Sequence, residues 1–452
     1  MDLRERIAAS RMQPFQWLVI GLCVMLNMID GYDVMALAFT AKSIGVELAL
    51  SPSQIGLLLS IGLVGMALGA LILAPLADKI GRRPLILISV ALSTVGMALS
   101  ATAGSALQLG AWRLITGLGV GGILACATVI ASEYSSRHRR GLAISIYTSG
   151  YGIGATLGGL VAVFLQTEHG WRAVFVFGAI LTGSALLVMT FLLPESVDFL
   201  YSRRPRAALA RINHIAARLK HEPVDNLPLS NADTSTPAGR IVDLFGAGNA
   251  RPTLLLWGAF FATLFGTFFV TSWTPTLLES AGLTKQQSAT AGMMLTLGGT
   301  VGALAFGLAA SRWQPRILLM VFTVLSAAAM ALFILTTSML PLAFALGIMV
   351  GGLSYGCIAG LYTLVPTLYT TQIRGTGVGW AIGVGRVGAI LAPLTAGALL
   401  DLGWTAASLY LAVAGVVMLA AVSLAFLQPN PRSDHSTSTV ETGSSDARPV
   451  AH

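Results

Sequence analysis

Two aspartates lie within an apolar stretch near the start of the chain. The motif Asp30-Gly31-Tyr32-Asp33 is set in a mostly apolar run from about residue 15 to residue 39. A carboxylate at the centre of a membrane span costs about 2.5–3.5 kcal/mol on insertion scales, so such residues are functional candidates. In a helix Asn27, Asp30 and Asp33 share one face, and Gly31 leaves room for a neighbouring helix or a ligand. Because a carboxylate in low dielectric can take up and release a proton near neutral pH, the pattern predicts a proton-linked substrate path. A solvated acidic turn in an early loop is the alternative, which the apolar sequence on both sides disfavours.

A single cation lies deep in the second half of the chain. Arg386 stands within an apolar segment that runs from about residue 375 to residue 399. An arginine in such a place needs a partner, and its planar fork suits a carboxylate. The partner is either the carboxylate of a ligand or one of the two aspartates, Asp30 or Asp33, and the two pairings could alternate.

The composition is that of an integral membrane protein. Of 452 residues, 55% are hydrophobic and 10% are charged, whereas soluble proteins carry about 25% charge. Long apolar runs and 50 glycines favour a closely packed helical bundle in lipid. The net charge of +8 does not indicate a nucleic-acid partner, because the basic residues fall in particular loops. The three cysteines, Cys23, Cys126 and Cys357, lie in apolar spans, and we expect no metal site, disulfide or cofactor.

At about 20 residues per span, the chain holds twelve apolar segments in two sets of six. Their approximate bounds are 16–40, 54–76, 84–103, 106–131, 141–165, 171–193, 253–280, 287–310, 316–337, 341–366, 375–399 and 403–427. We therefore predict an all-α membrane protein with two pseudo-symmetric halves, residues 16–193 and 253–427. An N-terminal segment (1–15), a polar central loop (194–252) and a disordered tail (428–452) flank them.

Lysine and arginine alternate between the loops. They are frequent before the first span, after the second and fourth spans and in the central loop, and they are absent from residues 47–53, 103–108 and 166–170. This asymmetry predicts that both termini and the central loop are cytoplasmic. The two halves also echo one another: residues 133–141 have a counterpart in residues 368–375. Such repeats suggest a transporter that binds its substrate between the halves.

One loop resembles a superfamily signature. Ala74-Pro75-Leu76-Ala77-Asp78-Lys79-Ile80-Gly81-Arg82-Arg83 resembles the loop between spans two and three of the major facilitator superfamily, with Ala74 in place of the usual glycine. The resemblance implies that Asp78 caps the helix beginning near Gly375. It also implies that the arginines, Arg82 and Arg83, meet an acid at the end of span four, so that Arg82 pairs with Glu133. Arg140 could join this cluster, which would hold the cytoplasmic side closed. Ser311 replaces the matching aspartate of the second half, so the gate would be one-sided.

Two further stretches narrow the resemblance. Residues 113–122, which begin with Arg113, are similar to the superfamily's span-four motif, in which the arginine is linked to proton transfer. A buried arginine stays charged and would favour the ionised form of a nearby carboxylate; an arginine reaching out to the surface is the alternative. The motif at residues 30–33 resembles that of the aromatic acid:proton symporter family, and residues 273–275 and 194–196 fit the same pattern. The resemblance implies that Asp30 and Asp33 are needed for the uptake of benzoate-type acids.

An aromatic acid needs a cation and flat walls. We assign its carboxylate to Arg386 and expect tyrosines, which offer hydroxyls, among the walls. In addition to Arg386, the substrate-binding candidates are Asn27, Tyr32, Tyr147, Tyr151, Trp273, Tyr355 and Tyr362.

Two motifs typical of enzymes are explained by membrane helices. Residues 117–122 match Gly-x-Gly-x-x-Gly and residues 352–356 match Gly-x-Ser-x-Gly, but both lie in apolar spans. We therefore predict a non-enzymatic, monomeric proton symporter of the bacterial inner membrane, whose partners are protons, a hydroxylated benzoate-type acid and lipid. The rivals are a proton-coupled exporter, against which the Gly154-Ala155 pair counts, and a membrane chemoreceptor for aromatic acids.

Overall fold

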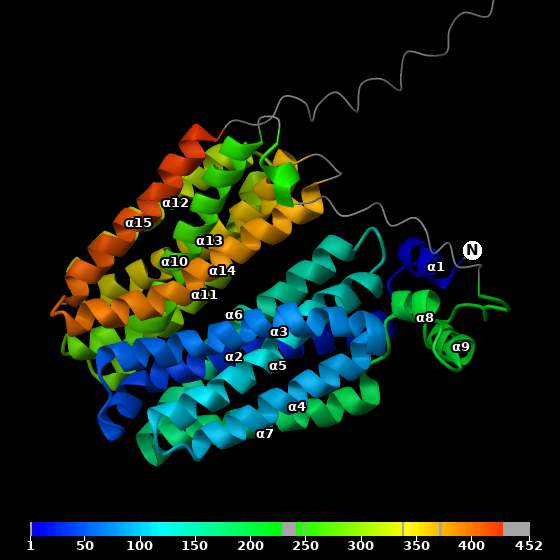
Figure 1. Ribbon diagram of the computed structural model, residues 1–452, viewed down its shortest axis with the longest axis horizontal. Coiled ribbons are helices and arrows are strands. Elements are labelled where there is room, and N and C mark those ends of the chain that lie inside the picture. Colours follow the sequence, from blue (N-terminus) through cyan, green and yellow to red (C-terminus); the bar gives the residue numbers. More distant parts are fainter. Residues whose placement is uncertain (1, 228–240, 247–248, 337–338, 370–372, 428–452) are drawn as a thin grey trace, which may run out of the picture.

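The structure is a computed structural model that describes residues 2–227, 241–246, 249–336, 339–369 and 373–427. The predicted tail, 428–452, and part of the predicted central loop lie outside these residues. Most of the described residues lie in helices, and none of them lies in a strand (Figure 1).

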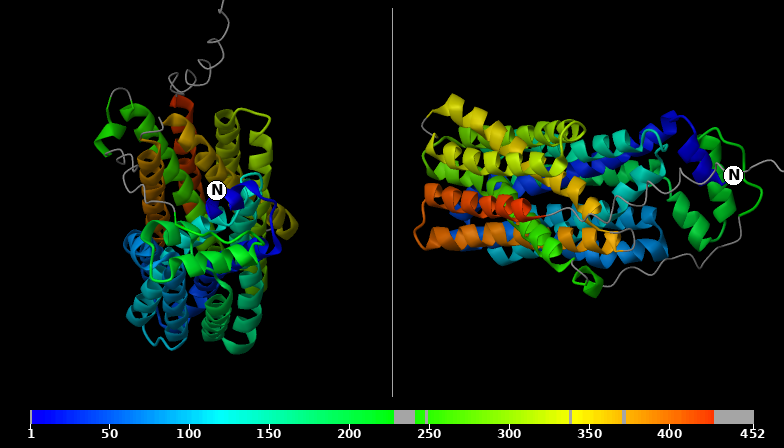
Figure 2. Two further views of the ribbon diagram at one scale, coloured as in Figure 1. Left: turned by 90° about the vertical axis from the view of Figure 1, so that its right-hand side faces the viewer. Right: turned by 90° about the horizontal axis from the view of Figure 1, so that it is seen from above.

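Twelve of the helices are long and apolar enough to cross a membrane, which confirms the predicted all-α, twelve-span fold. They are α2 (Pro14–Glu47), α3 (Pro52–Ile80), α4 (Arg82–Ala101), α5 (Ala106–Glu133), α6 (Arg140–His169), α7 (Trp171–Leu192), α10 (Ala250–Ser280), α11 (Lys285–Ala310), α12 (Pro315–Leu335), α13 (Leu340–Leu368), α14 (Arg374–Asp401) and α15 (Ala406–Phe426). Helices α2–α7 form one half and α10–α15 the other, and the two halves lie side by side (Figures 1 and 2). We call the end at which α2 begins and α15 ends the terminal face, and the other end the opposite face.

Local sequence signals set the helix boundaries. Ser51 accepts a hydrogen bond from the backbone N–H of Gln54, and the Gln54 side chain accepts one in return from the Ser51 N–H. Thr284 and Gln287 form the same capping box at the start of α11. Gly81 directly follows the end of α3, and few other residues adopt its φ of +106°.

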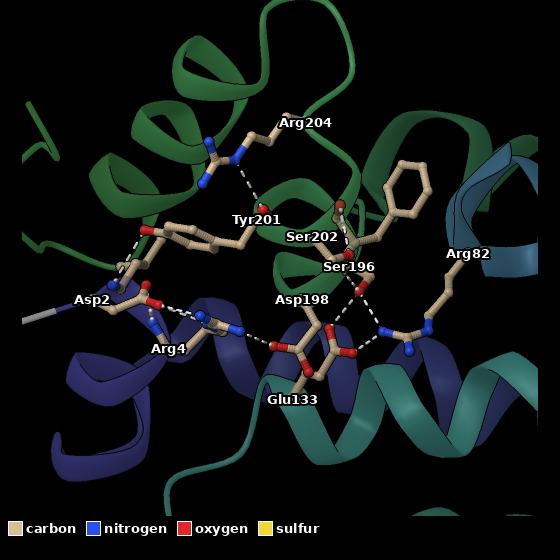
Figure 3. Close-up of polar contacts among 11 residues, drawn as sticks. Asp2, Arg4, Arg82, Glu133, Ser196, Asp198, Tyr201, Ser202 and Arg204 are labelled. Atoms are coloured by element: carbon tan, nitrogen blue, oxygen red, sulfur yellow. Dashed lines mark hydrogen bonds and ion pairs between the residues drawn. The ribbon is translucent and has the colours of Figure 1, made fainter. Parts of the chain in front are cut away.

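Three short helices cover the terminal face of the N-terminal half: α1 (Leu3–Ala9), α8 (Val197–Arg203) and α9 (Ala208–Arg218). The described part of the central segment, predicted only as a polar loop, thus contains two α-helices and a short 3-10 helix, η1 (Ile241–Leu244). Leu3 and Ile7 of α1 are buried against α8 and α9. Arg4 reaches Asp198 at 3.4 Å (Figure 3), and the N–H of Arg137, in the α5–α6 loop, donates to the Ala8 carbonyl at 2.8 Å. Since these partners belong to one half, the short helices form a single body with it.

Polar contacts between described residues of the two halves lie in the middle of the bundle or toward the opposite face. Lys42 of α2 approaches Glu279 of α10 at 3.5 Å. Between α3 and α14, the Ser53 N–H donates to Asp401 at 3.0 Å and the Ser60 hydroxyl to the Ile390 carbonyl at 2.7 Å. In the middle, the hydroxyls of Thr156 and Thr296 are 3.1 Å apart. The halves therefore meet at the opposite face in this conformation.

Gly31 allows a close approach of α2 to α6. A Cβ atom added at Gly31 would overlap the backbone carbonyl oxygen of Tyr151, and backbone cannot move aside as a side-chain tip can. We expect Gly31→Ala to lower the stability by about 1–3 kcal/mol, the usual cost of overpacking. Gly21→Ala on the same helix is the matched control, because a Cβ there has nothing within 4 Å. Thermal unfolding of the purified variants measures the difference, and equal melting temperatures would contradict the proposed close contact.

Candidate functional site

Asp33 and Arg113 form a buried ion pair inside the N-terminal half. Arg113 Nη1 lies 2.6 Å from Asp33 Oδ1 and Nη2 lies 3.0 Å from Oδ2, and each side chain is only 3% exposed. The two-pronged geometry is the strong form of the arginine–carboxylate contact. A cavity of about 10 Å³, room for roughly one water, adjoins the pair and reaches Ser272 of the other half. The pair is thus internal to one half but borders the interface, and Arg113 does not extend to the surface.

Asp30, one helical turn before Asp33, is buried and has no hydrogen-bond partner in the described part of the chain. Its side chain is 4% exposed, and Oδ1 has no donor or acceptor among the described residues. It lies within electrostatic range of Asp33 on its own helix and of Arg386 on α14 in the other half. A buried carboxyl group without partners is costly in its charged form, so this position suits reversible protonation.

Arg386 is half-buried on α14. In the part of the chain that the structure describes, no hydrogen bond or ion pair engages its guanidinium group, and neither Asp30 nor Asp33 contacts it. Tyr362 of α13 lies within its electrostatic range and is 44% exposed. The five donors of Arg386 are therefore open to a ligand.

Two predicted tyrosines face each other across the interface. Tyr151 of α6 and Tyr355 of α13 have ring centroids 6.4 Å apart. Both are within electrostatic range of Asp30, and Thr271 of α10 lies beside the Tyr355 hydroxyl. Asp30, Arg386 and these rings together place a proton acceptor, a cation and aromatic surface between the two halves.

The other predicted substrate residues are engaged within one half. Tyr32 donates to the Val174 carbonyl of α7 at 2.6 Å, and Asn27 donates to the Tyr147 carbonyl at 2.9 Å. The Tyr147 hydroxyl accepts a hydrogen bond from Thr128 at 3.2 Å, and Trp273 Nε1 donates to the Pro393 carbonyl at 3.1 Å. All four side chains are at most 5% exposed. Their contacts therefore support helix packing, and we do not include these residues in the proposed binding site.

A polar cluster at the terminal face joins α4, α5 and α8 (Figure 3). Arg82 Nη1 forms an ion pair with Glu133 and donates to the Ser196 hydroxyl at 2.5 Å. The Ser196 hydroxyl in turn donates to Glu133 at 2.7 Å. The structure thus brings together the two residues that the resemblance pairs. Arg83 extends elsewhere and donates to the Thr190 carbonyl at 2.6 Å.

Two further predicted gate residues, like Arg83, are outside this cluster. Asp78 and Arg140 are exposed. The backbone carbonyl of Asp78 accepts from Arg203 at 2.9 Å, but among the described residues no hydrogen bond joins its carboxylate to α14. Contact with the start of α14 requires the two halves to approach at the terminal face, where this conformation holds them apart.

Glu195 is a site residue that the sequence argument did not assign. Its Oε1 accepts hydrogen bonds from the N–H groups of Arg82 and Arg83 at 2.9 and 3.0 Å, so it caps the start of α4. Ser196 accepts from the Phe199 N–H at 3.1 Å and caps α8. The motif at residues 194–196 is the signal, because a Glu-Ser pair before a short apolar helix offers two capping side chains.

The fold and this arrangement define a multi-pass membrane transport protein. The family model described as Major Facilitator Superfamily matches residues 22–370 and 256–450. A gallate transporter of Pseudomonas putida is 32% identical over 410 residues, covering 89% of this chain and 90% of the relative. The 4-hydroxybenzoate transporter PcaK of Pseudomonas aeruginosa is 31% identical over 409 residues, with 89% and 90% covered. The chain belongs to the major facilitator superfamily and, within it, to the family of aromatic acid transporters.

A solved structure shares the fold. The inward-open conformation of the xylose transporter XylE from E. coli superposes with a TM-score of 0.71 over 92% of this chain and 96% of that one, at 16% sequence identity. This likeness supports the twelve-helix architecture alone.

Proposed function

We propose that the protein imports a hydroxylated benzoate-type acid together with at least one proton. The names of the two relatives support the substrate class. The observation that supports the proton coupling is the position of Asp30, a carboxyl group buried at the interface of the halves that has no hydrogen-bond partner among the described residues and lies within electrostatic range of Arg386.

The residues suggest an order of events. Arg386 binds the substrate carboxylate with its open donors, while Tyr151 and Tyr355 contact the ring. Asp30 takes up a proton beside the bound anion, which removes one negative charge from the low-dielectric interface. The second aspartate, Asp33, already has a buried counter-ion in Arg113, so the two aspartates have different roles: Asp30 carries the coupling proton and Asp33 forms the internal ion pair.

We place the protein in the bacterial inner membrane with its terminal face in the cytoplasm, as the distribution of lysine and arginine favours. In this orientation the conformation described here faces inward. Closing the terminal face would bring Asp78 toward α14, where an anion favours the helix N-terminus. The Arg82–Glu133 pair is already formed within the N-terminal half in this conformation, so it does not by itself close the terminal face.

Uptake of radiolabelled benzoates by cells expressing the chain, with and without a protonophore, tests the proposal. We expect one acid to accumulate against its gradient and the accumulation to collapse with the protonophore. Efflux of label from preloaded cells without uptake would contradict import, and saturable binding without flux would indicate a receptor.

Asp30→Asn is expected to abolish uphill accumulation, because Asn cannot carry the coupling proton. Exchange of labelled for unlabelled substrate at equal concentrations should continue, since Arg386 remains. Asp225→Asn is the control, because Asp225 is an exposed aspartate of the central segment. Full accumulation by Asp30→Asn would refute the assignment.

A further inference from the structure

A second cavity lies at the opposite face, away from the Asp30 and Arg386 region. It has a volume of about 670 Å³ and is bordered by residues of α2, α3, α10, α12, α14 and α15, so both halves contribute to its wall. This volume is within the range of about 300–1,000 Å³ that small-molecule sites occupy.

The cavity wall carries one cation. Lys42 lies in the wall, and its ammonium group makes a single contact of 3.5 Å with Glu279. Glu279 is not part of the wall, and its side chain is 16% exposed against 33% for Lys42. The cavity therefore meets the positive partner of a loose ion pair, which attracts an anion from the solution.

The rest of the wall suits a ring with a polar substituent. Trp404 is 40% exposed, and its neighbours in the wall include Leu50 and Leu400. Thr276 also borders the cavity and is 8% exposed, and its hydroxyl has no hydrogen-bond partner among the residues that the structure describes. An unpaired hydroxyl beside a cavity can be satisfied by a ligand.

We propose that this cavity is a second, peripheral binding site for a small aromatic carboxylate, which rests on the proposed function. The carboxylate binds Lys42, the ring lies against Trp404 and the apolar wall, and a ring hydroxyl group faces Thr276. Trp273 also lines the cavity, and its Nε1 donates to the Pro393 carbonyl of α14. The site thus lies between the two halves toward the opposite face.

Binding at this site has a consequence for the contact between the halves. Lys42 belongs to α2 and Glu279 to α10, so their ion pair links the two halves at the opposite face. A bound carboxylate competes with Glu279 for Lys42 and weakens that link. Occupancy of the peripheral site therefore favours separation of the halves at this face, which admits the ligand.

Equilibrium binding of radiolabelled 4-hydroxybenzoate to the purified full chain in lipid nanodiscs tests the proposal. We expect two sites in the wild type, one in Arg386→Gln, one in Lys42→Gln and none in the double variant. In the Arg386→Gln background, Trp404→Ala should weaken the remaining site by roughly five- to tenfold, as expected for loss of one aromatic contact.

Matched variants separate the charge of Lys42 from its ion pair. Glu279→Gln breaks the same ion pair but leaves the cation, so the peripheral site should remain and bind at least as tightly. Lys285→Gln and Trp313→Ala change exposed residues of the same types outside the cavity wall and should leave both sites intact. Loss of peripheral binding in Glu279→Gln would overturn the role of Lys42.

The outcomes distinguish this site from the proposed function. One equivalent of ligand in the wild type that disappears in Arg386→Gln overturns the peripheral site and leaves the central one. No binding of 4-hydroxybenzoate to the wild type, together with no benzoate uptake by cells, overturns both.

Discussion

Asp33→Asn is expected to destabilise the protein by about 3–5 kcal/mol, the usual cost of removing one partner of a buried ion pair. The change would leave the Arg113 guanidinium charged and without its counter-ion at a position where the side chain is 3% exposed. Arg113 Nε already lacks a partner among the described residues, so the asparagine amide cannot replace what the carboxylate supplies. Thermal unfolding of the purified protein in detergent measures the loss.

Two companion variants make this expectation specific. Asp30→Asn, one turn earlier on the same helix, should change the melting temperature little, because the Asp30 carboxyl group makes no hydrogen bond with a described residue. The double variant Asp33→Asn with Arg113→Gln should recover much of the lost stability, since no unpaired charge remains. If the Asp33→Asn and Asp30→Asn variants melt at the same temperature, the ion pair does not contribute the expected stability.

Arg386→Gln is expected to weaken substrate binding at the central site by roughly 100-fold or more, since two charge-assisted hydrogen bonds are lost. Arg386→Lys keeps the charge but loses the fork, so we expect an intermediate affinity. Binding of labelled benzoate to protein in nanodiscs, over a wide concentration range, provides the measurement.

Another arginine of the same half supplies the control for this second prediction. Arg316, at the start of α12, is bonded to backbone carbonyl groups of Leu424 and Ala425 at 3.0 and 2.6 Å, away from the interface of the halves. Arg316→Gln should leave the affinity unchanged. An unaltered affinity in Arg386→Gln would remove Arg386 from the substrate site and leave ion pairing with an aspartate as its remaining role.

Much of this architecture could be predicted because each membrane span is a continuous run of apolar residues that is visible in the sequence by itself. Twelve apolar runs and their loops define the fold, and the signature loop pairs Arg82 with Glu133 by resemblance. The contact of Asp33 with Arg113 is different, since it joins residues 80 positions apart. It depends on how α2 and α5 are rotated against each other, which periodicity does not specify when helices are apolar on nearly all sides.

The same limit explains the tyrosines and the gate. Tyr32 follows Asp30 by two residues, and on a helix that step turns the side chain toward a different neighbour, here α7. Tyr151 and Tyr355 reach the interface because α6 and α13 present those faces to each other. The expected contact of Asp78 with the start of α14 requires a different arrangement of the halves. The same sequence adopts each conformation of the transport cycle, so it does not specify which contacts a given conformation contains.

The short helices at the terminal face are attached to the N-terminal half, so any movement of this half includes them. Helix α1 is tied to α8 and to the α5–α6 loop, all within the N-terminal half, and Arg203 extends that attachment to the end of α3. The first residues of the chain must therefore follow every rotation of that half. A spectroscopic label on α1 would report the tilt of the N-terminal half relative to a label on α15, and the distance between them would act as a direct coordinate of the transport cycle.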